Sequence, residues 1–568
     1  MSSRWPLAVR AATSTAIPVL VGTAIGNVGA GLIATLGAFT ARFGGDRPYL
    51  NRGVQLAVVS VSLAAAVAVG AWAAQVTWVG IAVVSVVAVA AVWLCNALAV
   101  GPPGAYVFAL ACAAGVGVSA AKLAPWQLGA LVLCGGSVAW LVQMAGVLRE
   151  RRRPERVAVA AAGAAVATYV EAVGSAGETA ARHRAAAALH AAWNALVGFQ
   201  PSGADVTLQR LRAANHALHV LFADTMTASA VGDGPSPDAA DAARQIGDLA
   251  ADPEAVATRA TDRAPLGRPP AAALLLRALR PGSHVRHVMV RVAVAAPLAG
   301  TAATLVGIGH AYWAIAAAVL ILHQGADRNR TLRRGLDRLA GTWVGLILAA
   351  GILWLHPQGW WLAVILAALQ LTIEMLVVRH YGLASVFITA AALTIATGSH
   401  RVDVGEVLLA RGSDTLVGCA VGAAVFLVLS RFQESTRLLE AIADTVDAVA
   451  ATVPHLAADT ATLAAGTARR DLQLAAIDLR DAADAAAAGS ARLRATGELL
   501  APATVAAEHL AYRAVAACWE TDVRGSGPLV GPDDADAVVI QLRGLAAALR
   551  ARAVMAEDVA ALDGALRS

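Results

Sequence analysis

Six apolar stretches lie between Arg286 and Arg431, separated by short polar segments. They cover about residues 288–307, 311–323, 339–356, 359–378, 381–398 and 405–430. A membrane-spanning helix needs roughly 20 apolar residues, and several of these stretches approach that length. A soluble domain could not bury so many apolar stretches so close together, whereas a bilayer accommodates them as helices. The pattern therefore predicts a polytopic membrane unit made of helices.

A second set of six apolar stretches lies earlier in the chain, at about residues 7–25, 30–43, 54–75, 77–96, 104–120 and 124–148. The stretch at 30–43 is short for a span, so we expect it to be tilted, partial or re-entrant. The stretch at 7–25 resembles a signal peptide, but it leads directly into further apolar stretches. We therefore expect a retained first helix.

The composition agrees with a membrane protein. Hydrophobic residues make up 58% of the 568 residues and charged residues only 15%, which is too apolar for a soluble chain of this length. The formal net charge of +5 is spread beside the apolar stretches, which indicates positive-inside bias and argues against a nucleic-acid partner. The five cysteines form no CxxC pair, so they support neither a zinc site nor a disulfide framework.

Arginines alternate with the apolar stretches so that nearly all fall on one side of the bilayer. This predicts an inner-membrane protein whose termini both face the cytoplasm. The positions are Arg4, Arg10, Arg42, Arg47, Arg52, Arg149 and Arg151 to Arg153 in the first set, and Arg286, Arg291, Arg328 to Arg338, Arg379 and Arg431 in the second.

Two further regions have amphipathic rather than uniformly apolar periodicity, with charged residues and histidines recurring among Ala and Leu. We predict a cytoplasmic helical domain at residues 151–285 and another at 432–568. The transmembrane units then occupy residues 1–150 and 286–431. The predicted fold class is all-α, with two six-helix transmembrane repeats, each followed by a cytoplasmic helical domain.

The two halves align with each other. The segment from Gly31 to Gly53 matches the segment from Tyr312 to Gly335, because both place Gly-x-Asp-Arg after a short apolar stretch. Asp46, Arg47 and Arg52 are thus the first-repeat counterparts of the basic segment that follows Asp327. Both copies have the same predicted orientation, so the repeat is parallel. Charges within the spans occur only in the second copy.

The second copy resembles the fusaric acid resistance or aromatic acid exporter-like integral membrane transporters. The resemblance covers about residues 290–430 and rests on Tyr312-Trp313, Arg328 to Arg334, Arg338 with Gly341-Thr342 and Gly345, and Arg411 with Asp414-Thr415 and Gly418. It implies an inner-membrane secondary transporter that exports small organic, often aromatic, acids. Two alternatives stay open: an anion channel, since plant malate channels look related, and a membrane-anchored scaffold that acts through its helical domains.

The candidate substrate-binding residues are the arginines of the basic segment together with an aromatic and a buried cation, because guanidinium groups pair with carboxylates: Arg328, Arg333, Arg334, Arg338, Tyr312 and Arg411. Lipid contact and orientation are the alternative role for the basic segment. The candidate proton-coupling residues are Asp414, Glu374 and Asp327. Arg411 and Asp414 share a helix face and could form a structural ion pair. For Glu374, an interfacial position beside Arg379 is favoured.

No Walker A, GxSxG or HExxH motif is present, so we expect no enzyme, catalytic residue or cofactor. The histidines at positions 183, 190, 216 and 219 have no further converging ligands, so no metal site is expected. The expected partners are the lipid bilayer and a small organic anion, with a second copy of the chain or an accessory envelope protein as open alternatives.

Overall fold

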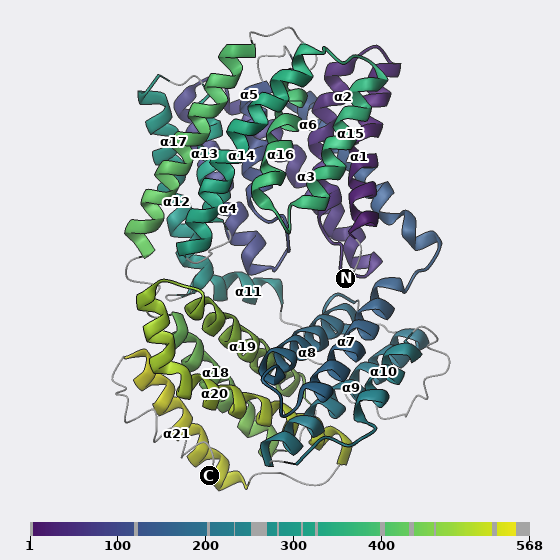
Figure 1. The fold of residues 1–568 in the computed structure, drawn as a ribbon, viewed down its shortest axis with the longest axis vertical. Coiled ribbons are helices and arrows are strands. Elements are labelled where there is room, and N and C mark those ends of the chain that lie inside the picture. Colours follow the sequence, from purple (N-terminus) through teal and green to yellow (C-terminus); the bar gives the residue numbers. More distant parts are fainter. Residues whose placement is uncertain are drawn as a thin grey trace. The chain divides into compact units, whose positions relative to one another are not determined.

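The computed structural model describes residues 4–118, 123–200, 205–231, 233–250, 270–280, 283–307, 310–323, 328–397, 404–430, 437–458, 462–524 and 531–551. Within these ranges the chain folds into helices and contains no β-strand (Figure 1). The all-α prediction is confirmed.

Contacts between residues divide the chain into two compact units. The membrane unit comprises residues 1–45, 49–151 and 270–431. The helical unit comprises residues 46–48, 152–269 and 432–568. Each unit therefore combines segments from both halves of the sequence.

The first membrane repeat contains six apolar segments in the predicted order. They are α1 (Trp5–Ala24), the broken pair α2 (Val28–Ala34) and η1 (Thr35–Arg42), α3 (Tyr49–Ala73), α4 (Thr77–Ala97), α5 (Tyr106–Val118) and α6 (Pro125–Met144), followed by the short η3 (Ala145–Leu148). Pro6 and Pro125 stand in the first turns of their helices, where a missing N–H costs nothing.

The second membrane repeat has the same sequence of segments, preceded by the short α11 (Ala271–Ala278). They are α12 (His284–Leu305), α13 (Ala311–Leu322), α14 (Arg328–Trp354), α15 (Trp360–Leu376), α16 (Tyr381–Thr397) and α17 (Val404–Ser430). The basic segment from Arg328 to Arg338 is the beginning of α14, not a separate turn.

Seven helices among the described residues are long and apolar enough to cross a membrane: α1, α3, α4, α6, α12, α14 and α17. Five shorter apolar helices accompany them. Their uniformly apolar composition and number confirm a polytopic membrane protein.

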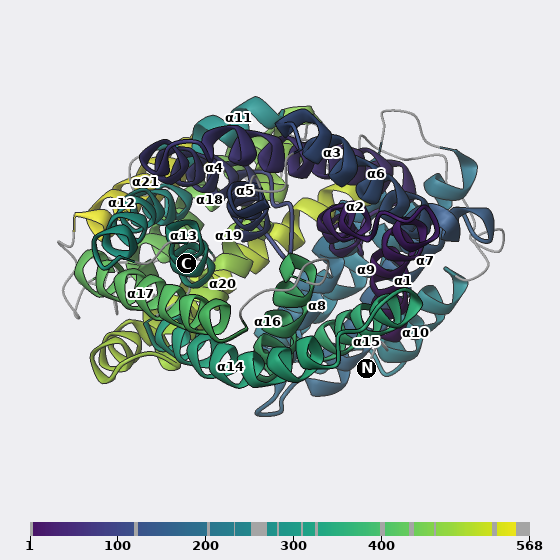
Figure 2. The same ribbon diagram turned by 90° about the horizontal axis from the view of Figure 1, so that it is seen from above.

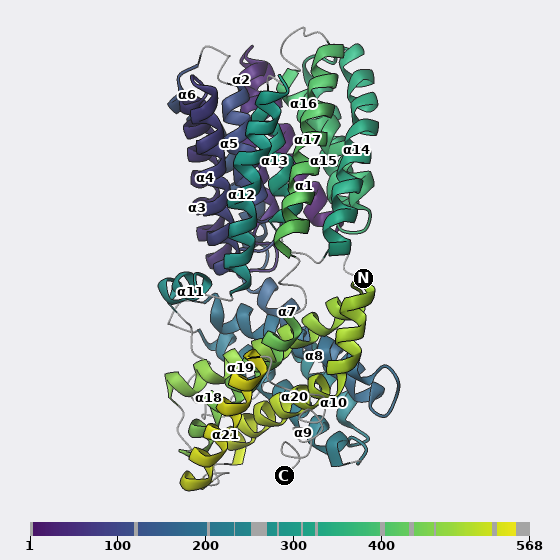
Figure 3. The same ribbon diagram turned by 90° about the vertical axis from the view of Figure 1, so that its left-hand side faces the viewer.

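The two membrane repeats exchange their first helices. α1 packs against α15 of the second repeat, and α12 packs against α4 of the first. Figure 2 shows these two pairs at opposite ends of the membrane unit, and Figure 3 shows α12 beside the helices of the first repeat. An interior proline, Pro18 or Pro297, is the fourteenth residue of each exchanged helix. The exchange relates the two repeats by approximate two-fold symmetry.

A close contact between two helices, made possible by a glycine, occurs in both membrane repeats. A side chain at Gly135 of α6 would collide with the carbonyl of Ala34, and one at Gly418 of α17 would collide with the carbonyl of Ala314. Lipid tails are as apolar as the helices, so packing of small residues holds such helices together. The two glycines therefore mark equivalent positions in the two repeats.

The helical unit is also duplicated. Its first half contains α7 (Arg153–Ala172), α8 (Glu178–Trp193), the π-turn η4 (Asn194–Gly198), α9 (Val206–Val231) and α10 (Ala239–Leu249). Its second half contains α18 (Arg437–Ala457), α19 (Leu463–Ala487), α20 (Ala491–Arg524) and α21 (Pro532–Arg550). In each half the first helix packs on the other three, and the halves join through α9 with α20 and α8 with α19.

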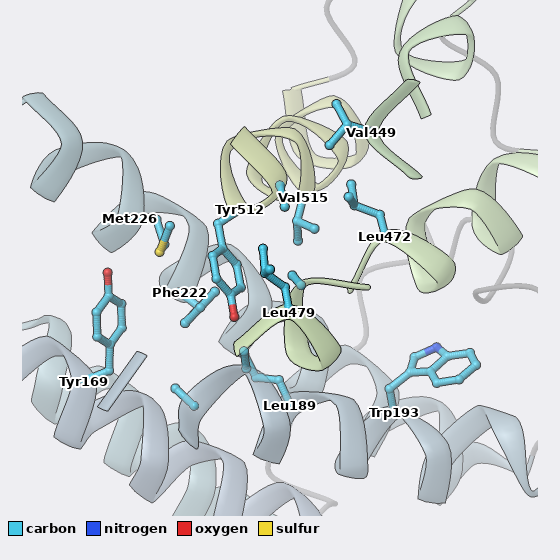
Figure 4. Close-up of a cluster of buried hydrophobic side chains, with 14 of the residues drawn as sticks. Tyr169, Leu189, Trp193, Phe222, Met226, Val449, Leu472, Leu479, Tyr512 and Val515 are labelled. Carbon is cyan, nitrogen blue, oxygen red and sulfur yellow. The ribbon is translucent and has the colours of Figure 1, made fainter. Parts of the chain in front are cut away.

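One hydrophobic core holds the two halves of the helical unit together (Figure 4). The ring of Phe222 on α9 lies 5.3 Å from the ring of Tyr169 and 6.0 Å from the ring of Tyr512 on α20. Each of these three side chains is at most 4% exposed. The two regions that are separate in the sequence therefore form one folded body.

Candidate functional site

A buried polar cluster lies where α13, α14 and α17 meet in the second membrane repeat. α13 is apolar on every face and is buried from Ala314 to Leu322, so protein surrounds it on all sides. Its first turn carries Tyr312 and Trp313, whose rings lie 5.6 Å apart. The Arg411 guanidinium of α17 lies 3.7 Å from the centre of the Trp313 ring. This cation–π contact holds a charged group that is only 6% exposed.

Asp414 lies one turn beyond Arg411 and is completely buried. Neither of its carboxylate oxygens has a hydrogen-bond partner within the described part of the chain. The ion pair predicted between Arg411 and Asp414 is not formed, because the guanidinium lies over the indole ring instead. Buried carboxylates in proteins are nearly always paired or hydrogen-bonded, so Asp414 is exceptional.

Arg338 brings a second buried guanidinium to this cluster from α14. It is 7% exposed, and its Nη1 donates to the Ser385 hydroxyl of α16 at 3.4 Å. Its charge and that of Asp414 both act on Arg411. One turn further along α14, the buried Thr342 hydroxyl has no hydrogen-bond partner among the described residues. The cluster thus holds two cations, one carboxylate and an unused hydroxyl.

The remaining arginines of the basic segment divide into two groups. Arg328 and Arg333 are exposed at the start of α14. Arg334 is half-buried, with its guanidinium 4.8 Å from the centre of the Tyr381 ring. Only Arg338 joins the buried cluster. Asp327, predicted as a coupling residue, lies outside the described residues.

Among its described residues, the first membrane repeat has no equivalent cluster. Counted from the matching glycines Gly135 and Gly418, the positions of Arg411 and Asp414 are occupied by Leu128 and Leu131. Among the predicted first-repeat counterparts, Arg52 is buried and donates to the carbonyls of Gly44 and Gly45, at 2.7 and 2.5 Å. These two hydrogen bonds stabilise the turn that precedes α3.

Asp46 and Arg47, the other two first-repeat counterparts, belong to the helical unit by their contacts. Arg47 places its guanidinium 4.2 Å from the centre of the Phe199 ring, and Asp46 is exposed. Neither residue lies in a position that matches the buried cluster of the second repeat.

Glu374 makes an ion pair that crosses between the two membrane repeats. Its Oε1 lies 2.7 Å from Nε of Arg42, the last residue of η1. Gln370 bridges both partners: its Nε2 donates to Glu374 at 2.9 Å, and its Oε1 accepts from Arg42 at 3.3 Å. The interpretation of Glu374 as an interfacial residue beside Arg379 stays a prediction, but the cation that its side chain contacts is Arg42, and the side chain is only 5% exposed.

Arg42 was missed as a site residue, because one basic residue at the end of an apolar stretch is explained by positive-inside bias alone. No sequence signal indicated its partner, which lies more than 300 residues away. Thr342 appeared only within the family resemblance, and Ser385 is one of many hydroxyls in the spans. Long-range packing alone identifies these residues.

The helical unit contains a buried carboxylate that, unlike Asp414, forms ion pairs. The Glu508 carboxylate accepts from Arg182 at 3.3 Å and from Arg480 at 3.4 Å, and it is 2% exposed. The sequence around Glu508, Ala-Ala-Glu-His, recurs in the first half of the helical unit as Ala-Ala-Asn-His. Asn215 therefore occupies the position of Glu508, and His219 occupies the position of Tyr512. Burial lowers the pKa of His219 to about 3 and that of His190 to about 4.

The cluster in the second membrane repeat is suited to an anion. Two buried guanidinium groups supply positive charge in an apolar surrounding, where each electrostatic contact is strong. Asp414 can hold or release one proton. In the part of the chain that the structure describes, no group of three or more His, Cys, Asp or Glu side chains could hold a metal ion.

The fold and this cluster define an all-α polytopic membrane protein with ionisable groups inside its spans. Residues 298–425 match the model of the fusaric acid resistance protein-like family, which confirms the family resemblance. The match lies within the second membrane repeat, and similarity to that family favours membrane transport.

Two relatives match the chain over different lengths. The uncharacterized membrane protein YvaC of Bacillus subtilis is 27% identical over 544 residues, which cover 89% of this chain and 84% of the relative. The uncharacterized protein slr1298 of Synechocystis is 30% identical over 162 residues, covering 28% of this chain and 20% of that protein. No solved structure matches the chain.

Proposed function

We propose that this protein is an inner-membrane secondary transporter that exports small organic anions, with aromatic carboxylates as the favoured class. One observation carries the proposal. Arg338 and Arg411 are buried in a membrane unit without a carboxylate partner in the described residues, beside a buried Asp414 that has no hydrogen-bond partner. Ionisable groups inside a membrane protein usually mark the path of a substrate or ion.

The residues have distinct roles in this mechanism. Arg338 and Arg411 attract the substrate carboxylate, and the Tyr312-Trp313 surface supports an aromatic ring. Asp414 exchanges a proton with the medium, so that transport draws on the proton gradient. The exposed Arg328 and Arg333 concentrate anions at the cytoplasmic mouth if the chain has the orientation that the positive-inside rule favours.

The test is efflux of radiolabelled benzoate from cells that express the full chain. We expect the wild type to export benzoate, and Arg411→Gln and Asp414→Asn to reduce export at least about tenfold, as loss of a buried charged contact does. Arg286→Gln is the matched control, because this arginine is exposed at the start of α12, has no role in the proposed mechanism and should keep the activity.

Equal benzoate retention in wild-type, variant and empty cells would contradict the proposal. Electrical recording on the purified protein separates an exporter from a channel. A channel would carry benzoate current in proportion to the applied voltage, without dependence on a proton gradient.

A further inference from the structure

The Arg42–Glu374 ion pair connects two bodies that a transporter of this kind has to move. Arg42 ends η1 in the first membrane repeat, and Glu374 lies near the end of α15 in the second. Their side chains are 10% and 5% exposed. In transporters built from repeats, alternating access is largely a rigid-body movement of one repeat against the other. A charged contact across that boundary has to break wherever the repeats separate.

Among the described residues, the symmetry-related contact has no ion pair. The alignment of the repeats places His323, which directly follows Leu322 at the end of α13, opposite Arg42, and this histidine is buried. Leu322 is buried in an apolar cluster with residues of α4, the counterpart of α15. The one polar contact described there is neutral: Asn96 of α4 donates to the His323 carbonyl at 3.4 Å. Packing at this boundary therefore does not require an ion pair.

A buried ion pair that the packing does not require needs another explanation. Replacing such pairs by apolar residues often leaves a protein as stable as before, whereas removing one partner leaves an uncompensated charge. Arg42 therefore needs some anion beside it in every state. Glu374 supplies that anion in the structure described. When the repeats move apart at this contact, another carboxylate has to replace it.

We propose that the transported anion opens this contact by taking the place of the Glu374 carboxylate on Arg42. The inference rests on the function proposed above and adds a second substrate-binding residue, Arg42, in the first membrane repeat. Guanidinium groups bind carboxylates in a planar, bidentate geometry, so the substrate carboxylate and the Glu374 carboxylate compete for the Arg42 guanidinium. Binding of the substrate anion to Arg42 and separation of the two repeats at this contact therefore occur in one step.

Gln370 is the positioning residue of this exchange. Its amide nitrogen donates to Glu374 and its amide oxygen accepts from Arg42, so it orients both partners. After the exchange, the amide nitrogen still holds the released Glu374 carboxylate. A neutral amide one turn before Glu374 does this without competing for the substrate.

The experiment measures thermal unfolding of the purified full chain in lipid nanodiscs as benzoate is added. Glu374→Gln removes the competing charge and keeps a similar shape, so we expect half-maximal stabilisation at a benzoate concentration about tenfold lower than in the wild type. Arg42→Gln should raise that concentration about tenfold. The double variant Arg42→Leu/Glu374→Ala replaces both partners of the buried ion pair by apolar residues, so it should fold and respond as weakly as Arg42→Gln. Arg286→Gln is the control, because this exposed arginine at the start of α12 belongs to neither site, and it should behave as the wild type.

Two outcomes would overturn the inference, and they are distinguishable. If benzoate stabilises the wild type, Arg411→Gln abolishes the effect, and the Arg42 and Glu374 variants match the wild type, then the contact is purely structural and the proposed function stands. If benzoate has no effect on the wild type at any concentration, while the protein is folded, then the proposed anion site and this inference fail together.

Discussion

In the first membrane repeat, Leu128 and Leu131 occupy the positions that Arg411 and Asp414 occupy in the second. The surrounding helices pack in the same way, with a glycine of the sixth segment against a carbonyl of the second. The fold therefore needs no charge at these positions. Packing does not explain the charges that the second repeat has there, which supports the roles proposed for Arg411 and Asp414 in binding and proton exchange.

The largest effect is expected when the second repeat is made like the first. Arg411→Leu with Asp414→Leu should reduce benzoate efflux to the level of empty cells, because the carboxylate and one of the two cations of the cluster are lost. The unfolding temperature should stay the same or rise, since apolar residues replace buried charges that are costly to desolvate. Efflux and thermal unfolding are measured on the same preparation. Efflux that survives in a folded double variant would contradict the assignment of the site.

In the helical unit, the same kind of exchange between the two halves removes a charge that is paired in the structure. Glu508→Asn gives the second half the residue that the first half has at Asn215. It leaves the buried Arg182 without its carboxylate, whereas Arg480, which is 26% exposed, keeps its ion pair with Asp484. We expect a loss of about 3–5 kcal/mol in the free energy of unfolding, as when one partner of a buried ion pair is removed. Denaturant unfolding measures it. The reverse variant, Asn215→Glu, is the control, and a loss below about 1 kcal/mol for Glu508→Asn would show that the arginines are hydrated instead.

The two packing glycines should be equally sensitive. Gly135→Ala and Gly418→Ala each add a methyl group that meets a carbonyl of the neighbouring helix. We expect each to destabilise the membrane unit by about 1–3 kcal/mol, the usual cost of overpacking. Thermal unfolding in nanodiscs compares them, with Gly351→Ala as the control, because nothing lies within 4 Å of that position. A large effect at one glycine alone would show that the repeats pack differently.

The smallest effect concerns pH. Burial lowers the pKa of His219 to about 3, with the charges of His216, Arg469 and His190 acting in the same direction. The unfolded chain binds a proton near pH 6.5 and the folded one does not, so the free energy of unfolding falls as the pH decreases from about 7 towards 4. Each such histidine contributes at most about 1.4 kcal/mol per pH unit.

His219→Tyr, which introduces the residue found at Tyr512 in the other half, should reduce this slope. Asp478 acts in the opposite direction, because burial, aided by the charge of Asp481, raises its pKa to about 6, so the folded chain gains a proton there below pH 6. Unfolding followed from pH 7 to 4.5 provides the measurement. His190→Gln is the second variant, and unchanged slopes in both would show that these imidazoles are not buried in solution.

Much of the fold was predictable because the signals are local. Apolar stretches, prolines in first turns and arginines at helix ends are visible in the sequence, and they gave the helices of both repeats in the correct order. The exchange of α1 and α12 left no such signal, since an apolar helix is equally compatible with several neighbours. Packing of small residues, which decides between them, depends on all twelve segments at once.

The site was predictable only in part for the same reason. Arg411 and Asp414 stood out, because charges within apolar stretches are rare and costly. Their i, i+3 spacing indicated a pair, but it could not show that Trp313 of another helix offers Arg411 a competing surface. Glu374 has Arg379 near it in sequence and Arg42 near it in space. Proximity in sequence was misleading here because the nearer cation lies beyond the end of the helix.

The exchange of first helices constrains how the protein can be made. α1 leaves the ribosome early, yet the helix it packs against is complete only when translation has passed Leu376. Throughout that interval α1 has its neighbours α2, η1 and α6 of the first repeat, but the side that packs on α15 is without its partner. The membrane insertion machinery or lipid has to shelter this helix until its partner arrives, so biogenesis of the chain is completed late and in one step.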